Sequence, residues 1–170
     1  MKFRHIETRD VTQTSELFRQ CLGDLIDRER IADPLLKRSE TERLIALMEI
    51  SLENASHNFF VAEENDTVLG TIALLPPGDI IKENLDCDKE ILEVSCVYVH
   101  PIYQKSGVGS FLFANIMDEL KKAGSNRFYL DAGFSSSQRY WLSKLGRETH
   151  LLEDYWGPGQ HHRIWEMEID

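Results

Sequence analysis

The segment at residues 104–110 reads Gln-Lys-Ser-Gly-Val-Gly-Ser and offers many backbone N–H groups. A strand-like apolar run precedes it, and a helix-like pattern begins within it. The first turn of a helix leaves N–H groups without partners, at the positive end of the helix dipole. Gly107 and Gly109 let a bulky anion approach the backbone, while Lys105 and Ser106 add side-chain donors. No acidic residue occurs from 105 to 113, so the segment predicts a phosphate-binding turn.

Glu93 is the one charged residue in an otherwise apolar run, which we expect to be a strand over residues 91–99. Alternate side chains of a strand share a face. We therefore expect Glu93 on one face with Ser95 and Val97, and the following residues on the other: Leu92, Val94, Cys96 and Tyr98. A carboxylate in this place either exchanges protons in a reaction or is a solvated residue on a half-covered strand.

Two other reactive residue types have plain structural interpretations. Adjacent strand residues point to opposite faces, so His161 and His162 cannot chelate a metal together, although His161 could line a pocket. Cys96 is expected to be a small buried side chain rather than a nucleophile. The cysteines (Cys21, Cys87 and Cys96) have neither disulfide-framework nor metal-site spacing. We therefore expect no metal site and a reducing, cytoplasmic location.

Composition narrows the class of protein. The chain has 170 residues, 42% of them hydrophobic and 28% charged, which fits one domain over residues 1–170. The net charge of −10 argues against nucleic acid or a membrane surface as a partner. No apolar run is long enough to cross a bilayer, and the first ten residues lack the apolar core of a signal peptide.

Strand and helix patterns alternate along the chain. Helical spacing occurs at residues 12–21, with Gly23 as the expected stop, and again around 44–48. Two more helices are expected, one from residue 109 to about 122 and one at 136–145. Residues 79–90 read as a charged loop. The expected strands cover residues 2–7, 59–63, 67–75, 91–99, 127–131, 151–156 and 163–169, the last two as a hairpin. This order predicts one mixed α/β domain.

The glycine segment resembles the acetyl-CoA loop of the GNAT superfamily of N-acetyltransferases. That loop has Gln or Arg, any two residues, Gly, any one residue, and then Gly or Ala. An apolar strand end precedes the Gln or Arg by five residues, often with Pro two residues after the strand end. The positions are filled here by Val99, Pro101, Gln104, Gly107 and Gly109. Lys144, Leu145 and Gly146 resemble part of the family's Tyr-x-Lys-x-Gly-Phe signature. The resemblance covers most of the chain in element order; the alternative is a plain strand-loop-helix connection.

The resemblance implies a fold and a cosubstrate. The fold would be α/β: a single mixed, mostly antiparallel sheet, splayed by a bulge in the strand at 91–99, with helices on both faces. Acetyl-CoA would place its pantetheine arm along that strand and its diphosphate on the amides of the loop, without a metal. The cofactor-binding residues would be Val97, Tyr98, Val99, Gln104, Lys105, Ser106, Gly107, Val108, Gly109 and Ser110.

The resemblance also implies chemistry. An amine acceptor must lose a proton before it attacks the thioester, and Glu93 stands where GNAT histone acetyltransferases have a catalytic Glu. At the position where the family has the Tyr that acts as general acid, this sequence has Leu142. Tyr140 lies about 200° around the helix from that position. Tyr140 and Tyr155 are therefore either weaker candidates for the acid or packing aromatics, and solvent could protonate the thiolate instead.

Two alternatives to the enzyme stay open at this point. One is a catalytically silent acyl-CoA-binding module of the same fold, which the loss of the Tyr at Leu142 favours. The other is a nucleotide-binding domain that uses the same glycine turn. For the enzyme, the acceptor would be the amine of a small molecule or a peptide, and a homodimer is open because dimers are common in the superfamily.

Overall fold

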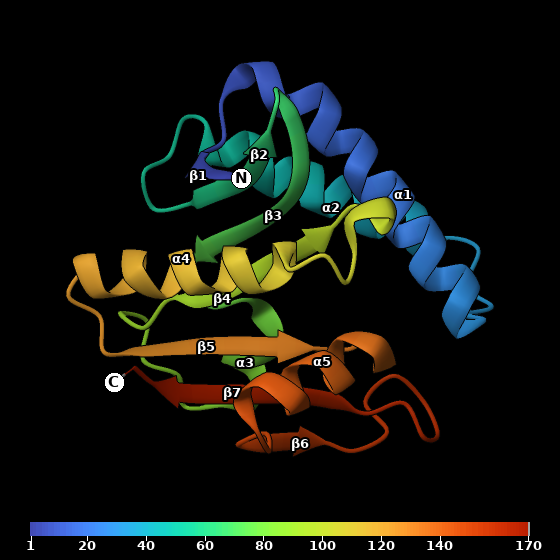
Figure 1. The fold of residues 1–170 in the computed structure, drawn as a ribbon. Coiled ribbons are helices and arrows are strands. Elements are labelled where there is room, and N and C mark those ends of the chain that lie inside the picture. Colours follow the sequence, from blue (N-terminus) through green and yellow to red (C-terminus); the bar gives the residue numbers. More distant parts are fainter. Residues whose placement is uncertain (170) are drawn as a thin grey trace.

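The computed structural model describes residues 1–169, which form a seven-stranded sheet in the order β1-β2-β3-β4-β5-β7-β6 (Figure 1). Neighbouring strands are antiparallel except β4 and β5, which are parallel. The strands are β1 Lys2–His5, β2 Asn58–Glu64, β3 Thr67–Leu75, β4 Glu93–Val99, β5 Arg127–Ala132, β6 His150–Leu152 and β7 His162–Glu168. The predicted mixed, mostly antiparallel sheet is confirmed.

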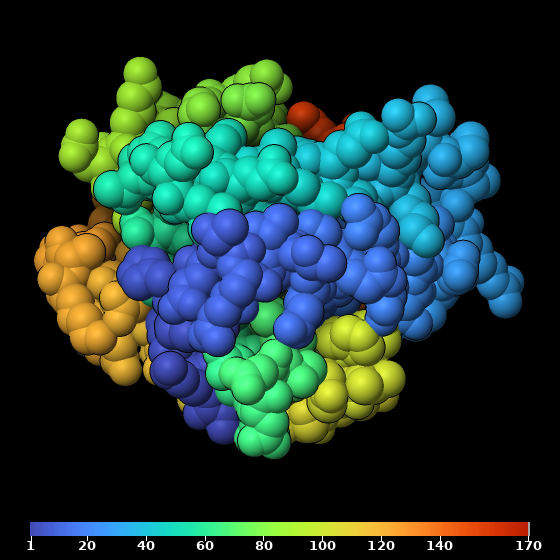
Figure 2. All heavy atoms as spheres, turned by 90° about the horizontal axis from the view of Figure 1, so that it is seen from above, coloured from blue at the N-terminus to red at the C-terminus, as the bar shows by residue number. Residues whose placement is uncertain are grey.

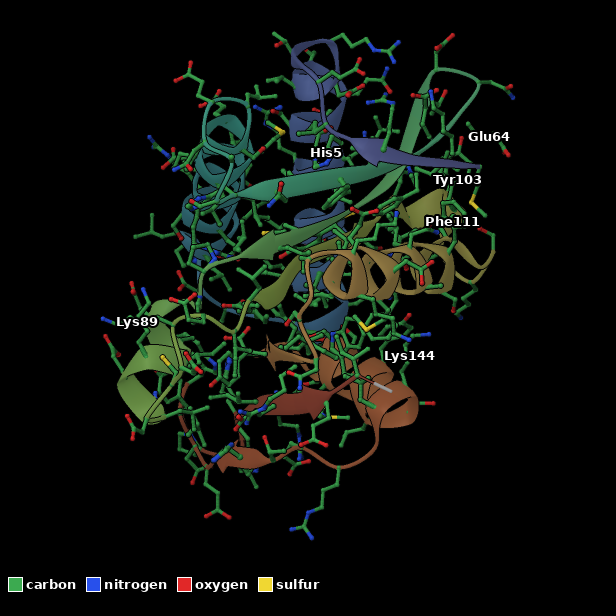
Figure 3. All side chains as sticks on the ribbon, turned by 90° about the vertical axis from the view of Figure 1, so that its left-hand side faces the viewer. His5, Glu64, Lys89, Tyr103, Phe111 and Lys144 are labelled. Carbon is green, nitrogen blue, oxygen red and sulfur yellow. The ribbon has the colours of Figure 1, made fainter. Side chains whose placement is uncertain are left out.

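Helices cover both faces of the sheet, as predicted. They are α1 Val11–Glu29, α2 Leu36–Ser51, α3 Asp79–Asn84, α4 Val108–Lys122 and α5 Ser135–Leu145, with short 3-10 turns at Thr8–Asp10 and Pro101–Tyr103. α1 and α2 lie side by side (Figure 2) and pack on one face, while α4 and α5 pack on the other. Lys89, just after α3, and Lys144, in α5, lie on opposite sides of the sheet (Figure 3).

The sheet opens between β4 and β5. These strands share a single register pair, Glu93 with Tyr129, and then part. On the other edge of β4, a bulge sets Cys96 and Val97 against one residue of β3. Cys96 has a φ of 53°, in the left-handed region that non-glycine residues rarely adopt. The predicted splay and bulge are therefore both present.

The bulge changes which side chains share a face, and here the sequence prediction was wrong. Val97 packs in the core cluster of α4, whereas Cys96 and Tyr98 pack in the cluster of α1 and α2. The inserted residue reverses the alternation after Ser95. Glu93 therefore shares its face with Cys96 and Tyr98, not with Val97.

Two element boundaries also differ from the prediction. α1 continues past Gly23 to Glu29 instead of stopping there. A Cβ at Gly23 would lie 2.8 Å from Lys37 Nζ, so the glycine makes room for a side chain of α2 rather than ending a helix. The charged segment 79–90 begins with the short helix α3, whose Ile81 is fully buried against the sheet.

Within residues 1–169, no helix has both the length and the apolar character that a bilayer span requires.

Candidate active site

Six successive backbone N–H groups, from residue 105 to residue 110, donate no hydrogen bond within the described residues. The first intrahelical bond of α4 comes one residue later, from Phe111 N–H to the Gly107 carbonyl at 2.9 Å. Gly107 caps the helix with a φ of 92°, and Lys105 has a φ of 62°. Consecutive left-handed and helical residues turn successive N–H groups toward a common point. The turn therefore has the geometry that an anion-binding turn requires, and its binding of an anion stays a prediction.

Two side chains of this turn serve the turn itself. Gln104 Nε2 donates to the Val99 carbonyl at 3.1 Å, which ties the loop to the end of β4. The Ser106 hydroxyl donates to the Tyr103 carbonyl at 2.5 Å. In this structure the hydroxyl proton of Ser106 is used within the loop, and its predicted role as a side-chain donor to an anion stays a prediction.

Tyr140, on α5, lies beside the start of α4. A Cβ at Gly109 would stand 3.3 Å from the Tyr140 hydroxyl oxygen. Burial raises the pKa of Tyr140, and a hydrogen bond with Ser110 partly offsets that rise. Leu142, at the place where the family motif has Tyr, packs against the core cluster beneath α4. Tyr140 thus adjoins the anion-binding turn through Gly109 and Ser110.

The β5-facing edge of β4 has no strand partner beyond Glu93 among the described residues. Such an edge leaves backbone groups for an extended ligand. The Val99 carbonyl already accepts from Gln104 Nε2 and from Cys21 Sγ, the latter at 3.3 Å. The side chain of Tyr98 packs edge-on against Phe18, with ring centroids 5.6 Å apart. Val97 is thus the better candidate for a backbone carbonyl that contacts the ligand, and Tyr98 can contact the ligand only through its backbone.

Glu93 stands at the point where β4 and β5 part and is only 5% exposed. Its Oε2 accepts a hydrogen bond of 2.7 Å from the Gly78 N–H, at the start of α3. Burial, and next the negative charge of Asp131, raise the pKa of Glu93 to about 8. Hydrogen bonds from Gly78 and Ser95 and the positive charge of Arg43 act in the opposite direction. A carboxyl group with a pKa near the working pH suits general base catalysis.

Asp131 lies near Glu93 on the same face and His162 lies beside Asp131, although the sequence analysis assigned neither of them to the site. Asp131 follows Tyr129, the register partner of Glu93, by two residues, and the alternation of β5 places it on Glu93's face. Its Oδ2 lies 3.1 Å from Nε2 of the buried His162 on β7. Three strands distant in sequence meet here. In the sequence, Asp131 is only a carboxylate at the end of the predicted strand 127–131. Such residues are too common at strand ends to mark a functional site.

The loop between β6 and β7 covers this cluster with aromatic side chains. The predicted strand at 151–156 ends at Leu152, and turns follow. Tyr155 is 37% exposed and stacks at an angle near His162, with ring centroids 5.7 Å apart. His161 Nδ1 accepts from the Asp154 N–H at 3.0 Å and so stabilises the loop. His162, rather than His161, is the histidine that lies beside Glu93's neighbour.

Cys96 is buried, and burial raises the pKa of its thiol to about 12, so it is not an activated nucleophile. All three cysteines are free thiols. Within residues 1–169, no group of His, Cys, Asp and Glu side chains is arranged to hold a metal ion.

The sequence pattern of the Acetyltransferase (GNAT) family matches residues 19–146. This range contains the splayed strand, the anion-binding turn and α4. The chain belongs to the GNAT acetyltransferase family. The predicted resemblance is thus confirmed. A search of curated protein sequences finds no match to this GNAT protein.

Solved structures share the GNAT fold over nearly the whole chain. A GNAT-family protein from Desulfovibrio desulfuricans is 16% identical with a TM-score of 0.72, and each chain is covered over 99% of its length. PaiA N-acetyltransferase from Thermoplasma acidophilum, in complex with coenzyme A, is 18% identical with a TM-score of 0.70 and 98% coverage of both chains. YncA from Salmonella typhimurium, with acetyl-CoA, is 20% identical with a TM-score of 0.71, covering 100% of this chain and 94% of YncA.

Proposed function

We propose that this GNAT protein transfers an acetyl group from acetyl-CoA to a primary amine by direct attack of the amine on the thioester. The observation that carries the proposal is the row of unpartnered N–H groups at residues 105–110, beside the gap between β4 and β5. A diphosphate suits the N–H groups, and an extended pantetheine arm suits the free strand edge. The CoA and acetyl-CoA complexes of the structural neighbours support this choice of cosubstrate.

Glu93 is the proposed base. The amine nitrogen attacks the carbonyl carbon of the thioester, and its proton passes to the carboxylate directly or through a water molecule. A β4 N–H group near the bulge would stabilise the tetrahedral oxyanion. The C–S bond then breaks and CoA leaves as a thiolate. Because the pKa of a thiol is only about 8.5, solvent suffices to protonate it. Tyr140 and Tyr155 are the secondary candidates for this proton donor.

Acetyl-CoA turnover with a panel of primary amines tests the proposal. Release of the free CoA thiol and the mass of the acetylated amine are measured together, so that simple thioester hydrolysis is distinguished from transfer. We expect amine-dependent CoA release in the wild type and an acetylated product. Thioester hydrolysis alone, or no turnover with any amine, would contradict the proposal.

A silent acyl-CoA-binding module is the second candidate, and one observation favours it: a partly buried leucine, Leu142, packs against the core where the family signature has Tyr. Such a module would gain thermal stability from acetyl-CoA but would acetylate no amine. A nucleotide-binding domain would be stabilised by ATP instead.

We also propose that residues 1–170 work as one domain in a reducing compartment, the cytoplasm, which the three free thiols support.

A further inference from the structure

His162 carries a buried polar atom that nothing in residues 1–169 satisfies. The side chain is 4% exposed, and its Nε2 atom has no hydrogen-bond partner there. A buried polar group without a partner is unfavourable unless a ligand or an ordered water supplies one. The atom therefore marks a place where a bound molecule can make a hydrogen bond.

The neighbouring tryptophan determines which hydrogen-bonding role this atom has. Trp156 Nε1–H donates to His162 Nδ1 at 3.1 Å. An indole N–H can only donate, so Nδ1 carries no proton and the ring proton sits on Nε2. Gly133 makes this arrangement possible, because a Cβ there would lie 3.1 Å from both atoms of the hydrogen bond. His162 therefore presents a donor that needs an oxygen acceptor.

A carboxylate stands beside this donor without pairing with it. Asp131 Oδ2 lies 3.1 Å from His162 Nε2, yet the two make no hydrogen bond, because the oxygen lies off the direction of the N–H bond. The Asp131 side chain is 25% exposed, so solvent reaches the carboxylate, while His162 Nε2 lies buried behind it. Asp131 also shares its sheet face with Glu93, the proposed base.

Only some chemical groups satisfy an adjacent carboxylate and N–H donor together. An ammonium group can donate to Asp131 but offers nothing to the His162 N–H, and an alkyl chain satisfies neither. A hydroxyl group donates to the carboxylate and accepts from the N–H at once. We therefore propose that Asp131 and His162 bind a hydroxyl group of the acceptor. The acceptor is then an amino alcohol, such as an amino sugar, whose amine lies at Glu93; this inference rests on the proposed function.

Matched amines test the inference. Each amino alcohol is compared with the alkylamine and the diamine of equal length: 3-amino-1-propanol with n-butylamine and 1,3-diaminopropane, and the same series one carbon shorter and longer. A site built around a hydroxyl group rejects analogues that lack it. We expect at least one amino alcohol to exceed both analogues by about tenfold or more in kcat/KM. In Asp131→Asn this preference should fall to within about twofold.

The control is Asp118→Asn, which removes one charge from an exposed position on α4 and should keep the preference. Trp156→Phe removes the donor that fixes the His162 tautomer, so the preference should shrink there too. An equal or better rate with the alkylamine or the diamine would overturn the inference and leave the proposed function standing. So would a preference that survives Asp131→Asn.

Calorimetry separates failure of the inference from failure of the proposed function. The same amines are titrated into the wild type and Asp131→Asn, both saturated with CoA. Binding of an amino alcohol that Asp131→Asn abolishes, in a protein that acetylates nothing, would support this site and contradict the transferase. No binding and no turnover with any amino alcohol would overturn the inference.

Discussion

The Thr71 hydroxyl donates a buried hydrogen bond of 2.8 Å to the carbonyl oxygen of Cys96, the residue at which β4 bulges. Thr71 is fully buried on β3, where it pairs with Tyr98 and adjoins Ile72, the residue that faces the bulge. The bond gives a partner to the Cys96 carbonyl oxygen, at the point where the bulge interrupts the regular pairing of β3 and β4. It therefore stabilises the distortion in β4, along whose free edge the pantetheine arm is proposed to lie.

Thr71→Val should lower the free energy of unfolding by roughly 1–3 kcal/mol, because it leaves the Cys96 carbonyl buried without this donor. It should also weaken acetyl-CoA binding, since the bulge is then less firmly held. Denaturant unfolding and calorimetry measure the two effects. Thr14→Val is the control: the Thr14 hydroxyl is buried with no partner in residues 1–169, so its removal should cost no stability. Equal losses in both variants would contradict the role given to Thr71.

Gly107→Glu should abolish acetyl-CoA binding. It places a negative charge among the N–H groups proposed to bind the diphosphate. The backbone strain of a left-handed residue, about 1–2 kcal/mol, comes in addition. Gly124→Glu is the matched control, because Gly124 also has a positive φ, 74°, and open space around its Cβ position, but it lies at the other end of α4. Calorimetry on both folded variants decides; unchanged affinity in Gly107→Glu would remove the cofactor site.

Glu93→Gln should become more stable relative to the wild type as the pH rises. Burial and the Asp131 charge raise the folded-state pKa of Glu93 to about 8, against an ordinary value of 4.5. Between these values the folded protein holds a proton that the unfolded chain releases, so wild-type stability falls as the pH rises toward 8. The stability that the protonated carboxyl contributes is fully present below pH 4.5. Thermal melts of both proteins from pH 5 to pH 9 measure the difference; a constant gap would contradict the raised pKa.

Tyr140→Phe should change kcat little and raise the KM for acetyl-CoA a few-fold. The Tyr140 hydroxyl adjoins Gly109 at the start of α4, where the diphosphate is proposed to bind. Steady-state kinetics separate the two parameters. A loss of about a hundredfold in kcat would instead identify Tyr140 as the general acid, since positioned acids contribute about that much or more.

The anion-binding turn could be predicted because its signal is local. Gly107, Gly109 and the lack of acidic residues lie within one short stretch, and the strand and helix around it have clear periodicities. Glu93 could be singled out for the same reason, as a lone charge in an apolar run. These features depend on neighbours in sequence, which a single chain displays directly.

The faces of β4 and the second half of the site could not be predicted. The left-handed conformation of Cys96 depends on its partner strand and on Thr71, and nothing in the residue type indicates it. Asp131 and His162 meet only because β5 and β7 pair, 31 residues apart in sequence. Gly23 was expected to end a helix, because the space that it leaves for Lys37 is a tertiary contact that the sequence does not show.

Turnover against pH, measured for the wild type and Glu93→Gln with saturating acetyl-CoA and amine, tests the central claim most directly. Glu93→Gln keeps the side-chain shape and removes the proton acceptor. At neutral pH it should be slower by about 10²–10⁴-fold, the usual contribution of a positioned base. The wild-type rate alone should rise as Glu93 ionises, so the gap should widen up to about pH 8. It should narrow only above that pH, where the amine arrives already neutral and needs no base. Equal rates for the two proteins at every pH would contradict the assignment of Glu93 as the base.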